Sequence, residues 1–92
     1  SVYSVRLYEL LKQYQKAGRR TFEVDEIRKM LAVGDLYPTF RSFNQNVLTK
    51  ATKEINKKSR DITVTMQANR KGRFVEKVSF VIDKYEEGSQ DD

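Results

Sequence analysis

Apolar residues recur at helical spacing near the start of the chain. The positions that follow an i, i+3, i+4, i+7 pattern are Leu7, Leu10, Leu11 and Tyr14. This pattern predicts an amphipathic helix. Ser4 precedes it and is the predicted N-cap, because a serine hydroxyl accepts a hydrogen bond from a free N–H of the first turn. Gly18 is predicted to end the helix, since glycine adopts left-handed backbone angles easily.

In the next stretch, the spacing of apolar residues changes from a helical to a strand period and then back to a helical one. Residues 20–24 alternate and are rich in β-prone side chains, so they predict a short strand. Asp25 is the predicted N-cap of a second, short helix. The expected inner face of that helix holds Ile27, Met30 and Leu31.

A longer helix is predicted over residues 39–59, with Pro38 at its first position, where proline is favoured. Tyr37 comes before this proline and is therefore expected outside the right-handed helical region. The expected buried face consists of Phe40, Phe43, Val47, Leu48, Ala51 and Ile55. Thr49 and Thr52 are weak helix formers, so a break near residues 48–50 is an open alternative.

Two strands follow the long helix. Ile62, Val64 and Met66 alternate with polar residues, and the last strand is expected to place Phe74, Val78, Phe80 and Ile82 on one face. Residues 68–73 lie between these strands and predict a hairpin loop, with Gly72 at a positive φ angle.

The order helix, strand, helix, helix, strand, strand is typical of a winged helix-turn-helix. The predicted fold class is therefore α+β, with three helices, a small antiparallel sheet and a basic wing hairpin. Residues 1–84 are expected to form this domain, and residues 85–92 an acidic, flexible tail.

Positive charge is concentrated in the middle of the chain. Residues 38–77 carry ten basic and three acidic side chains, a net charge of +7, whereas residues 1–37 carry +2 and residues 78–92 carry −4. A concentrated basic surface attracts a polyanion such as nucleic acid. The alternative is that the basic surplus only keeps the domain soluble.

The composition excludes several classes of site. The chain has no cysteine and no histidine, so it forms no disulfide, no Cys/His zinc site and no catalytic pair that needs either residue. No cofactor or metal is predicted. No apolar run reaches the ~20 residues that span a bilayer, so no membrane partner is predicted either.

The face of the long helix opposite its apolar stripe has an unusual composition. At ~100° per residue, this face holds Ser42, Gln45, Asn46, Thr49, Lys53 and Asn56, flanked by Arg41, Lys50 and Lys57. It carries no carboxylate, and Glu54, the one acid of the helix, lies at the edge of the buried stripe. Amide and guanidinium groups can pair with base edges, and Lys can neutralise phosphates. The predicted DNA-binding residues of this recognition helix are Arg41, Ser42, Gln45, Asn46, Thr49, Lys50, Lys53 and Lys57. The alternative is a solvent-facing helix that lacks acids by chance.

The hairpin between the last two strands is basic at its tip. Arg70, Lys71 and Arg73 are predicted to reach a phosphate or the minor groove of DNA, although such a tip can also be an ordinary solvated turn. For Tyr37, in the loop before the long helix, two interpretations remain open: either its hydroxyl contacts a phosphate or its ring packs over Pro38.

Specific stretches of the chain resemble a known family. These are the YSxRLYELLxxY stretch at residues 3–14, GRRTF at 18–22, DEIRKML at 25–31, FNQNVL at 43–48 and VLxxAxxEIN at 47–56. Together they resemble the plasmid replication initiators of the Rep_3 superfamily. The resemblance extends over residues 3–82. It departs from the family at Thr49-Lys50, where many relatives have Asp-Pro.

The resemblance implies a C-terminal, second winged-helix domain, whose partner is the N-terminal winged-helix domain of the same full-length protein. Such a domain binds the repeated origin sequences (iterons) of a plasmid as double-stranded DNA in the bacterial cytoplasm. The predicted function is therefore sequence-specific binding of plasmid-origin DNA to initiate replication, without catalysis. The alternative is a protein-interaction or dimerisation module that packs on a second copy or on host replication proteins. A nuclease is disfavoured because it needs clustered carboxylates to hold metal ions.

Overall fold

The structure, a computed structural model, describes residues 1–86, and its elements follow the predicted order. They are α1 (Val2–Lys12), β1 (Arg19–Glu23), α2 (Val24–Met30), α3 (Phe40–Phe43), the π-helix η1 (Asn44–Leu48), α4 (Thr49–Lys58), β2 (Ile62–Lys71) and β3 (Phe74–Lys84). α3, η1 and α4 follow one another directly, so we call residues 40–58 the long helix. Three helices and a small antiparallel sheet confirm the predicted winged-helix fold.

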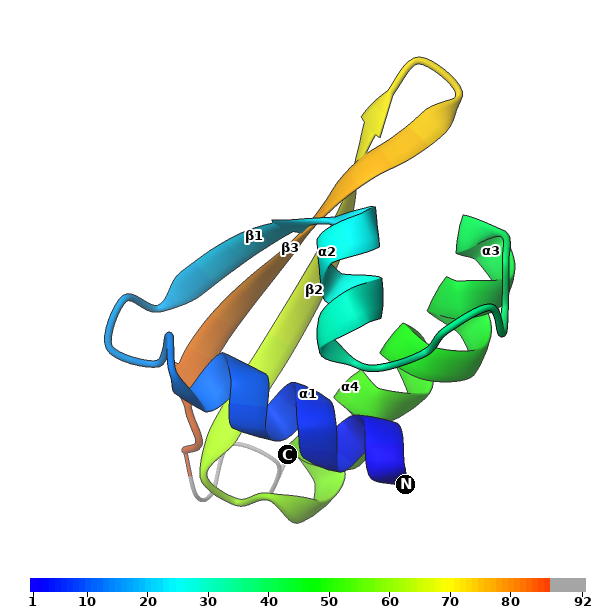
Figure 1. Cartoon of the computed structure of the whole chain (residues 1–92). Helices are drawn as coiled ribbons and strands as arrows, with labels where there is room; N and C mark the ends of the chain where they lie inside the picture. The colour runs from blue at the N-terminus through cyan, green and yellow to red at the C-terminus, as the bar shows by residue number, and fades with distance from the viewer. Residues whose placement is uncertain (87–92) are drawn as a thin grey trace.

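The three strands form one antiparallel sheet in the order β1-β3-β2, visible in Figure 1. Phe22 pairs with Val78, and Met66 pairs with Phe80. Successive side chains of a strand point to opposite faces. The buried apolar residues of the sheet therefore all lie on the face that packs against the helices: Phe22, Ile62, Val64, Val78, Phe80 and Ile82.

The helices cover this face with their own apolar residues. Leu7 and Leu11 of α1, Ile27 of α2 and Phe43 of the long helix are fully buried. The ring of Phe22 forms edge-to-face contacts with Tyr14 and Phe80, at centroid distances of 6.1 and 6.0 Å. Such pairs add a specific geometry to the area that the rings bury.

The predicted apolar faces are largely confirmed, but two of their residues are exposed. Four others are only half-buried: Leu10, Tyr14, Phe40 and Met66. Met30 is 44% exposed, because α2 ends there and the chain turns at Ala32 (φ 56°), which brings Val33 into the core instead. Phe74 is 78% exposed, because the hairpin at that point extends beyond the core.

The predicted ends of the first two helices are wrong by a few residues. Ser1, not Ser4, is the N-cap of α1, and the Ser4 hydroxyl donates back to the Ser1 carbonyl over 2.8 Å. Gly18 is left-handed (φ 84°) but ends a series of turns after Lys12, not the helix itself. Glu23, not Asp25, is the N-cap of α2, and its N–H donates to the Glu26 carboxylate over 3.3 Å.

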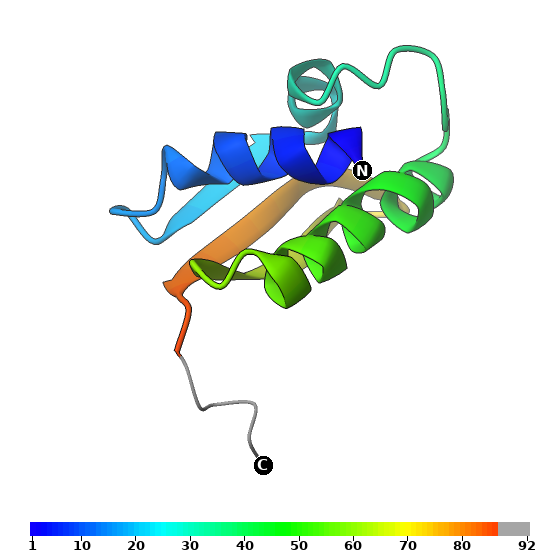
Figure 2. The same ribbon diagram turned by 90° about the horizontal axis from the view of Figure 1, so that it is seen from below.

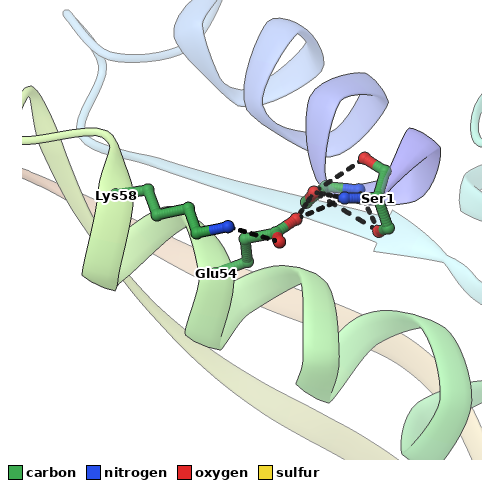
Figure 3. A network of polar contacts seen from close by, with 4 residues as sticks. Ser1, Glu54 and Lys58 are labelled. Carbon is green, nitrogen blue, oxygen red and sulfur yellow. Dashed lines mark hydrogen bonds and ion pairs between the residues drawn. The ribbon is translucent and has the colours of Figure 1, made fainter.

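Two groups of polar contacts join the α1 segment to α4 and to the turn that follows α4; α1 and α4 lie side by side in Figure 2. The Glu54 carboxylate accepts from the N-terminal amino group of Ser1 at 2.6 Å, from the buried Ser4 hydroxyl, and from Lys58 at 3.3 Å, as Figure 3 shows. At the other end of α1, Asp61 accepts from the Tyr8 hydroxyl and pairs with Lys12 at 2.8 Å. These contacts explain why Glu54 turns away from the acid-free face of the long helix.

In the 92-residue chain, whose first residue carries a free amino group, we expect stability at acid pH to depend on Glu54. The Ser1 amino group, then the Ser4 hydroxyl and Lys58, lower the pKa of Glu54 from 4.5 to about 2. A lowered folded-state pKa adds stability above the ordinary pKa, and this stability is lost as pH falls through about 2. Glu54→Gln should therefore lower Tm at pH 7, by an amount that shrinks toward zero near pH 2.

Thermal unfolding of both proteins from pH 7 to pH 2 checks this expectation. Glu76→Gln, at an exposed position of β3, is the matched control and should unfold like the parent at pH 7. A Tm difference for Glu54→Gln that stays constant over the whole pH range would contradict it.

The turn between α2 and the long helix is held by Arg28. Its guanidinium donates to the backbone carbonyls of Tyr37 (2.7 Å), Gly34 (2.9 Å) and Leu36 (2.6 Å). It also lies 5.0 Å from the centre of the Phe43 ring. Arg28 therefore fixes the loop that leads into the long helix.

The long helix begins after this turn. Thr39 is its N-cap and accepts from the Ser42 N–H at 3.1 Å. Pro38 thus lies one residue before the cap, and the prediction that it takes the first helical position is wrong. Tyr37 leaves the right-handed helical region, as expected, and has a positive φ of 52°.

The end of the described chain remains attached to the domain. The Tyr85 N–H donates to the Asp61 carbonyl at 3.0 Å, directly after β3. Most of the predicted acidic tail over residues 85–92 lies outside the described residues.

Candidate nucleic-acid interface

The long helix is continuous through the position where a break was considered. Thr49 and Thr52 both lie within α4. A π-turn precedes them, and the Thr49 N–H donates to the Asn44 carbonyl, five residues back. This wider turn lets the adjacent residues Val47 and Leu48 both be buried. π-turns inside helices are frequent at functional sites.

The long charged and amide side chains of the polar face of the long helix are open to solvent. Arg41, Gln45, Lys50, Lys53 and Lys57 are exposed. Within residues 1–86, none of the four cations among them forms an ion pair. Their charges are therefore available to a polyanion, and the only acid of the long helix, Glu54, is engaged by α1.

The three small polar residues of this face are half-buried and bonded within the helix. The Asn46 amide donates to the Ser42 carbonyl at 2.9 Å, and the Thr49 hydroxyl donates to Asn44 Oδ1 at 3.3 Å. Within residues 1–86, no group donates a hydrogen bond to Asn46 Oδ1, so this oxygen can still accept one from a ligand. Gln45 is thus the amide side chain that is most available for binding.

Asn56 does not belong to the open face. Its amide group donates to the Val64 carbonyl at 2.9 Å and accepts from the Val64 N–H at 2.7 Å. Both backbone groups lie on the side of β2 that faces away from β3. Asn56 therefore joins the long helix to the edge of the sheet, and the prediction that it faces solvent is wrong. Helical spacing places Asn56 opposite the apolar stripe, but it does not show that β2, which begins four residues after α4 ends, packs against this position.

The hairpin of β2 and β3 forms a long wing that extends past the helices in Figure 1. Its strands continue to Lys71 and from Phe74, so the turn is shorter than the loop predicted over residues 68–73. Gly72 has the expected positive φ, 63°. Arg70, Lys71 and Arg73 are all exposed at the tip, and the Arg70 guanidinium donates to the Arg73 carbonyl at 3.3 Å.

The fold brings the tip of the wing close to the start of the long helix. A groove of about 470 Å³ lies between them, and its lining includes Phe40, Arg41, Asn44, Arg73 and Phe74. The sequence predicted the two basic segments separately but missed Asn44 and Phe74. Asn44 was missed because it lies between the apolar face and the polar face of the predicted helix. Phe74 was assigned to the core because it shares the alternating strand face of Val78, Phe80 and Ile82.

Tyr37 is half-buried and packs against the core, and its carbonyl is the acceptor of Arg28. Its position is therefore determined by the turn before the long helix.

Comparison with known proteins agrees with this geometry. The model of the family described as initiator Rep protein, WH2, matches residues 23–82. This chain is a WH2 domain of that family. The match begins at Glu23, the last residue of β1, and includes α2, the long helix and nearly all of the wing hairpin, so it spans both elements of the candidate interface.

A solved structure is similar to the WH2 domain over nearly its whole length. It is the crystal structure of the Pi initiator protein in complex with iteron DNA, with 32% sequence identity and a TM-score of 0.77. The similarity covers 95% of this chain and 40% of the Pi chain. The WH2 domain thus corresponds to less than half of that initiator. A search of curated proteins gave no match.

Two further observations concern other kinds of site. Within residues 1–86, no group of three or more acidic, histidine or cysteine side chains is placed to hold a metal ion. No helix in that part of the WH2 domain has the length and apolar character required to cross a membrane.

Proposed function

We propose that this WH2 domain binds the iteron repeats of a plasmid origin as double-stranded DNA and so contributes to replication initiation. The observation that carries the proposal is the acid-free, exposed face of the long helix beside a basic wing. The similarity to the Pi initiator, whose structure contains iteron DNA, supports the same ligand.

The long helix fits the role of recognition helix. The major groove of B-DNA admits one α-helix, and its base edges carry a distinct pattern of donors and acceptors. Gln45 is exposed and can pair with adenine through both amide atoms, and Asn46 can do so if its amide leaves Ser42. Ser42 and Thr49 supply hydroxyl groups nearby, and the exposed Lys50, Lys53 and Lys57 can neutralise phosphates.

The domain acts by binding and not by catalysis, in the bacterial cytoplasm. Its partners are origin DNA and the N-terminal winged-helix domain of the full-length initiator, with host replication proteins as further partners. The 40% coverage of the Pi chain is consistent with a domain that works beside others.

We expect the helix and the wing to have separable effects on DNA binding. Gln45→Ala should lower the preference for the selected sequence about tenfold, because a bidentate base contact contributes ~1–3 kcal/mol of discrimination. Arg70 and Lys71 changed together to Ala should weaken binding to all duplexes alike. Affinity should also fall steeply with salt, because phosphate contacts release counterions.

The measurement is fluorescence anisotropy with two duplexes at several salt concentrations. One duplex is selected from a random pool by the parent protein, and the other is scrambled. Lys16→Ala, an exposed residue outside the interface, is the control. Equal losses on both duplexes for Gln45→Ala would refute base readout. No binding to any duplex, together with a dimer in light scattering, would favour the protein-interaction module instead.

A further inference from the structure

The groove between the long helix and the wing has a chemistry of its own. Its helix side contains Phe40, Arg41 and Asn44, and its hairpin side contains Arg70, Arg73 and Phe74. No carboxylate lines it, and within residues 1–86 none of its three arginines forms an ion pair. Guanidinium groups bind phosphate oxygens through two parallel hydrogen bonds, so this arrangement favours a phosphate ligand.

The groove also contains an aromatic ring that the fold does not use. Phe74 is 78% exposed, whereas the half-buried Phe40 contacts the core residue Phe43 at a centroid distance of 6.4 Å. An exposed phenylalanine between arginines adds nothing to the core. It offers an apolar surface to whatever enters the groove.

The position of the groove indicates which part of DNA enters it. In a B-form duplex, one sugar-phosphate strand separates each major groove from the adjacent minor groove. A helix in the major groove and a hairpin beside it therefore have a backbone strand between them. A phosphodiester strand presents anionic oxygens and, between them, the apolar faces of its sugars, which matches the arginines and the ring.

We propose that this groove holds the sugar-phosphate backbone of one strand of bound duplex DNA, with Arg41 and Arg73 on phosphates and Phe74 against a deoxyribose. The proposal rests on the proposed function. It assigns Arg41 to the backbone and not to a base, and it adds Phe74, a residue that base readout does not require.

The arginines and the ring differ in their dependence on salt. Arg41→Gln and Arg73→Gln should each weaken binding about tenfold on the selected and the scrambled duplex alike. Each should also reduce the slope of log K against log salt by about 1. Phe74→Ala should weaken binding about fivefold with the slope unchanged, because an apolar contact releases no counterion, and Phe74→Leu should recover most of the loss.

Controls separate these effects from folding. Arg19→Gln removes an exposed arginine on β1 that pairs with Val81, near the end of β3 opposite the wing tip, and should leave affinity unchanged. Arg70 is left intact because it bonds the Arg73 carbonyl and supports the turn. The exposed variants should keep the parent Tm.

A neutral methylphosphonate, placed at each backbone position of the selected duplex in turn, locates the contact. A methylphosphonate at one or two of these positions should weaken DNA binding by the parent about tenfold but leave binding by Arg41→Gln or Arg73→Gln unaffected.

The proposal is overturned if a methylphosphonate at every position weakens binding by the parent and by these variants equally. It is also overturned if Arg41→Gln selects a different sequence from a random pool than the parent does. If these variants bind normally while Gln45→Ala still loses preference, the groove proposal fails and the proposed function stands. If the parent binds no duplex, both fail.

Discussion

Replacing Asn56 with alanine should destabilise the domain by about 3 kcal/mol. The change removes the donor to the Val64 carbonyl and the acceptor for the Val64 N–H, and Val64 itself is only 2% exposed. A lost hydrogen bond costs ~0.5–1.5 kcal/mol, and each buried group left unsatisfied costs ~1–3 kcal/mol. In a domain of this size, Tm falls by ~4–8 °C per kcal/mol, so a decrease on the order of 10–20 °C is expected.

Urea and thermal unfolding measure this effect. Asn56→Asp keeps an acceptor for the Val64 N–H but places a second oxygen against the Val64 carbonyl, so it should recover only part of the stability. Gln45→Ala, on the exposed side of the same helix, should change stability by less than ~0.5 kcal/mol. If Asn56→Ala unfolds like the parent and loses sequence preference, Asn56 faces DNA and the assignment to the sheet edge is wrong.

Replacing Arg28 with alanine should destabilise the domain by about 3 kcal/mol and also weaken DNA binding. Arg28 donates to three carbonyls of the turn before the long helix. Hydrogen bonds from a charged group contribute ~1.5–3 kcal/mol each, and solvent at this half-buried position reduces the sum. Without these bonds the turn loses its fixed shape, and Thr39 no longer presents a defined start of the helix.

Hydrogen exchange and DNA affinity test the two consequences separately. Amide exchange over residues 31–39 should accelerate in Arg28→Ala, and affinity should fall even at temperatures where the variant is fully folded. Arg28→Lys should restore little, because an ammonium group cannot serve three carbonyls in the geometry of a planar guanidinium. Lys29→Ala, the exposed neighbour on α2, is the control. Unchanged exchange in residues 31–39 would show that the turn does not depend on Arg28.

Local pattern predicted most of the secondary structure correctly. The apolar spacing of the long helix identified Phe43, Val47, Leu48, Ala51 and Ile55, all of which are buried. Strand parity identified Val78, Phe80 and Ile82 in the same way. These predictions succeed because a helix or strand with one apolar face has only one way to bury it.

Helix ends and isolated residues were predicted less well. Ser4 and Asp25 have good capping side chains, yet each lies inside the first turn, because Ser1 and Glu23 precede them with capping geometry of their own. Alternation along β3 puts Phe74 on the same face as the buried residues, but alternation does not tell how far the hairpin extends beyond the core.

The recognition face was predicted in composition but not in its details. The absence of acids between residues 41 and 57, apart from Glu54, is a property of the sequence alone. The direction of each side chain depends on partners that lie outside the long helix. Glu54 turns to Ser4, and Asn56 turns to Val64. The helix-to-helix and helix-to-sheet contacts thus decide which polar groups remain available to DNA.

The sequence by itself determined the order of the elements, their apolar faces and the separation of charge along the chain. These features follow from side-chain periodicity and composition, which act over one or two turns. Only the tertiary structure decided that Arg41 and Phe74, more than thirty residues apart, line one groove. The packing of the long helix on the sheet determines this, because it fixes where the wing lies relative to the start of the helix.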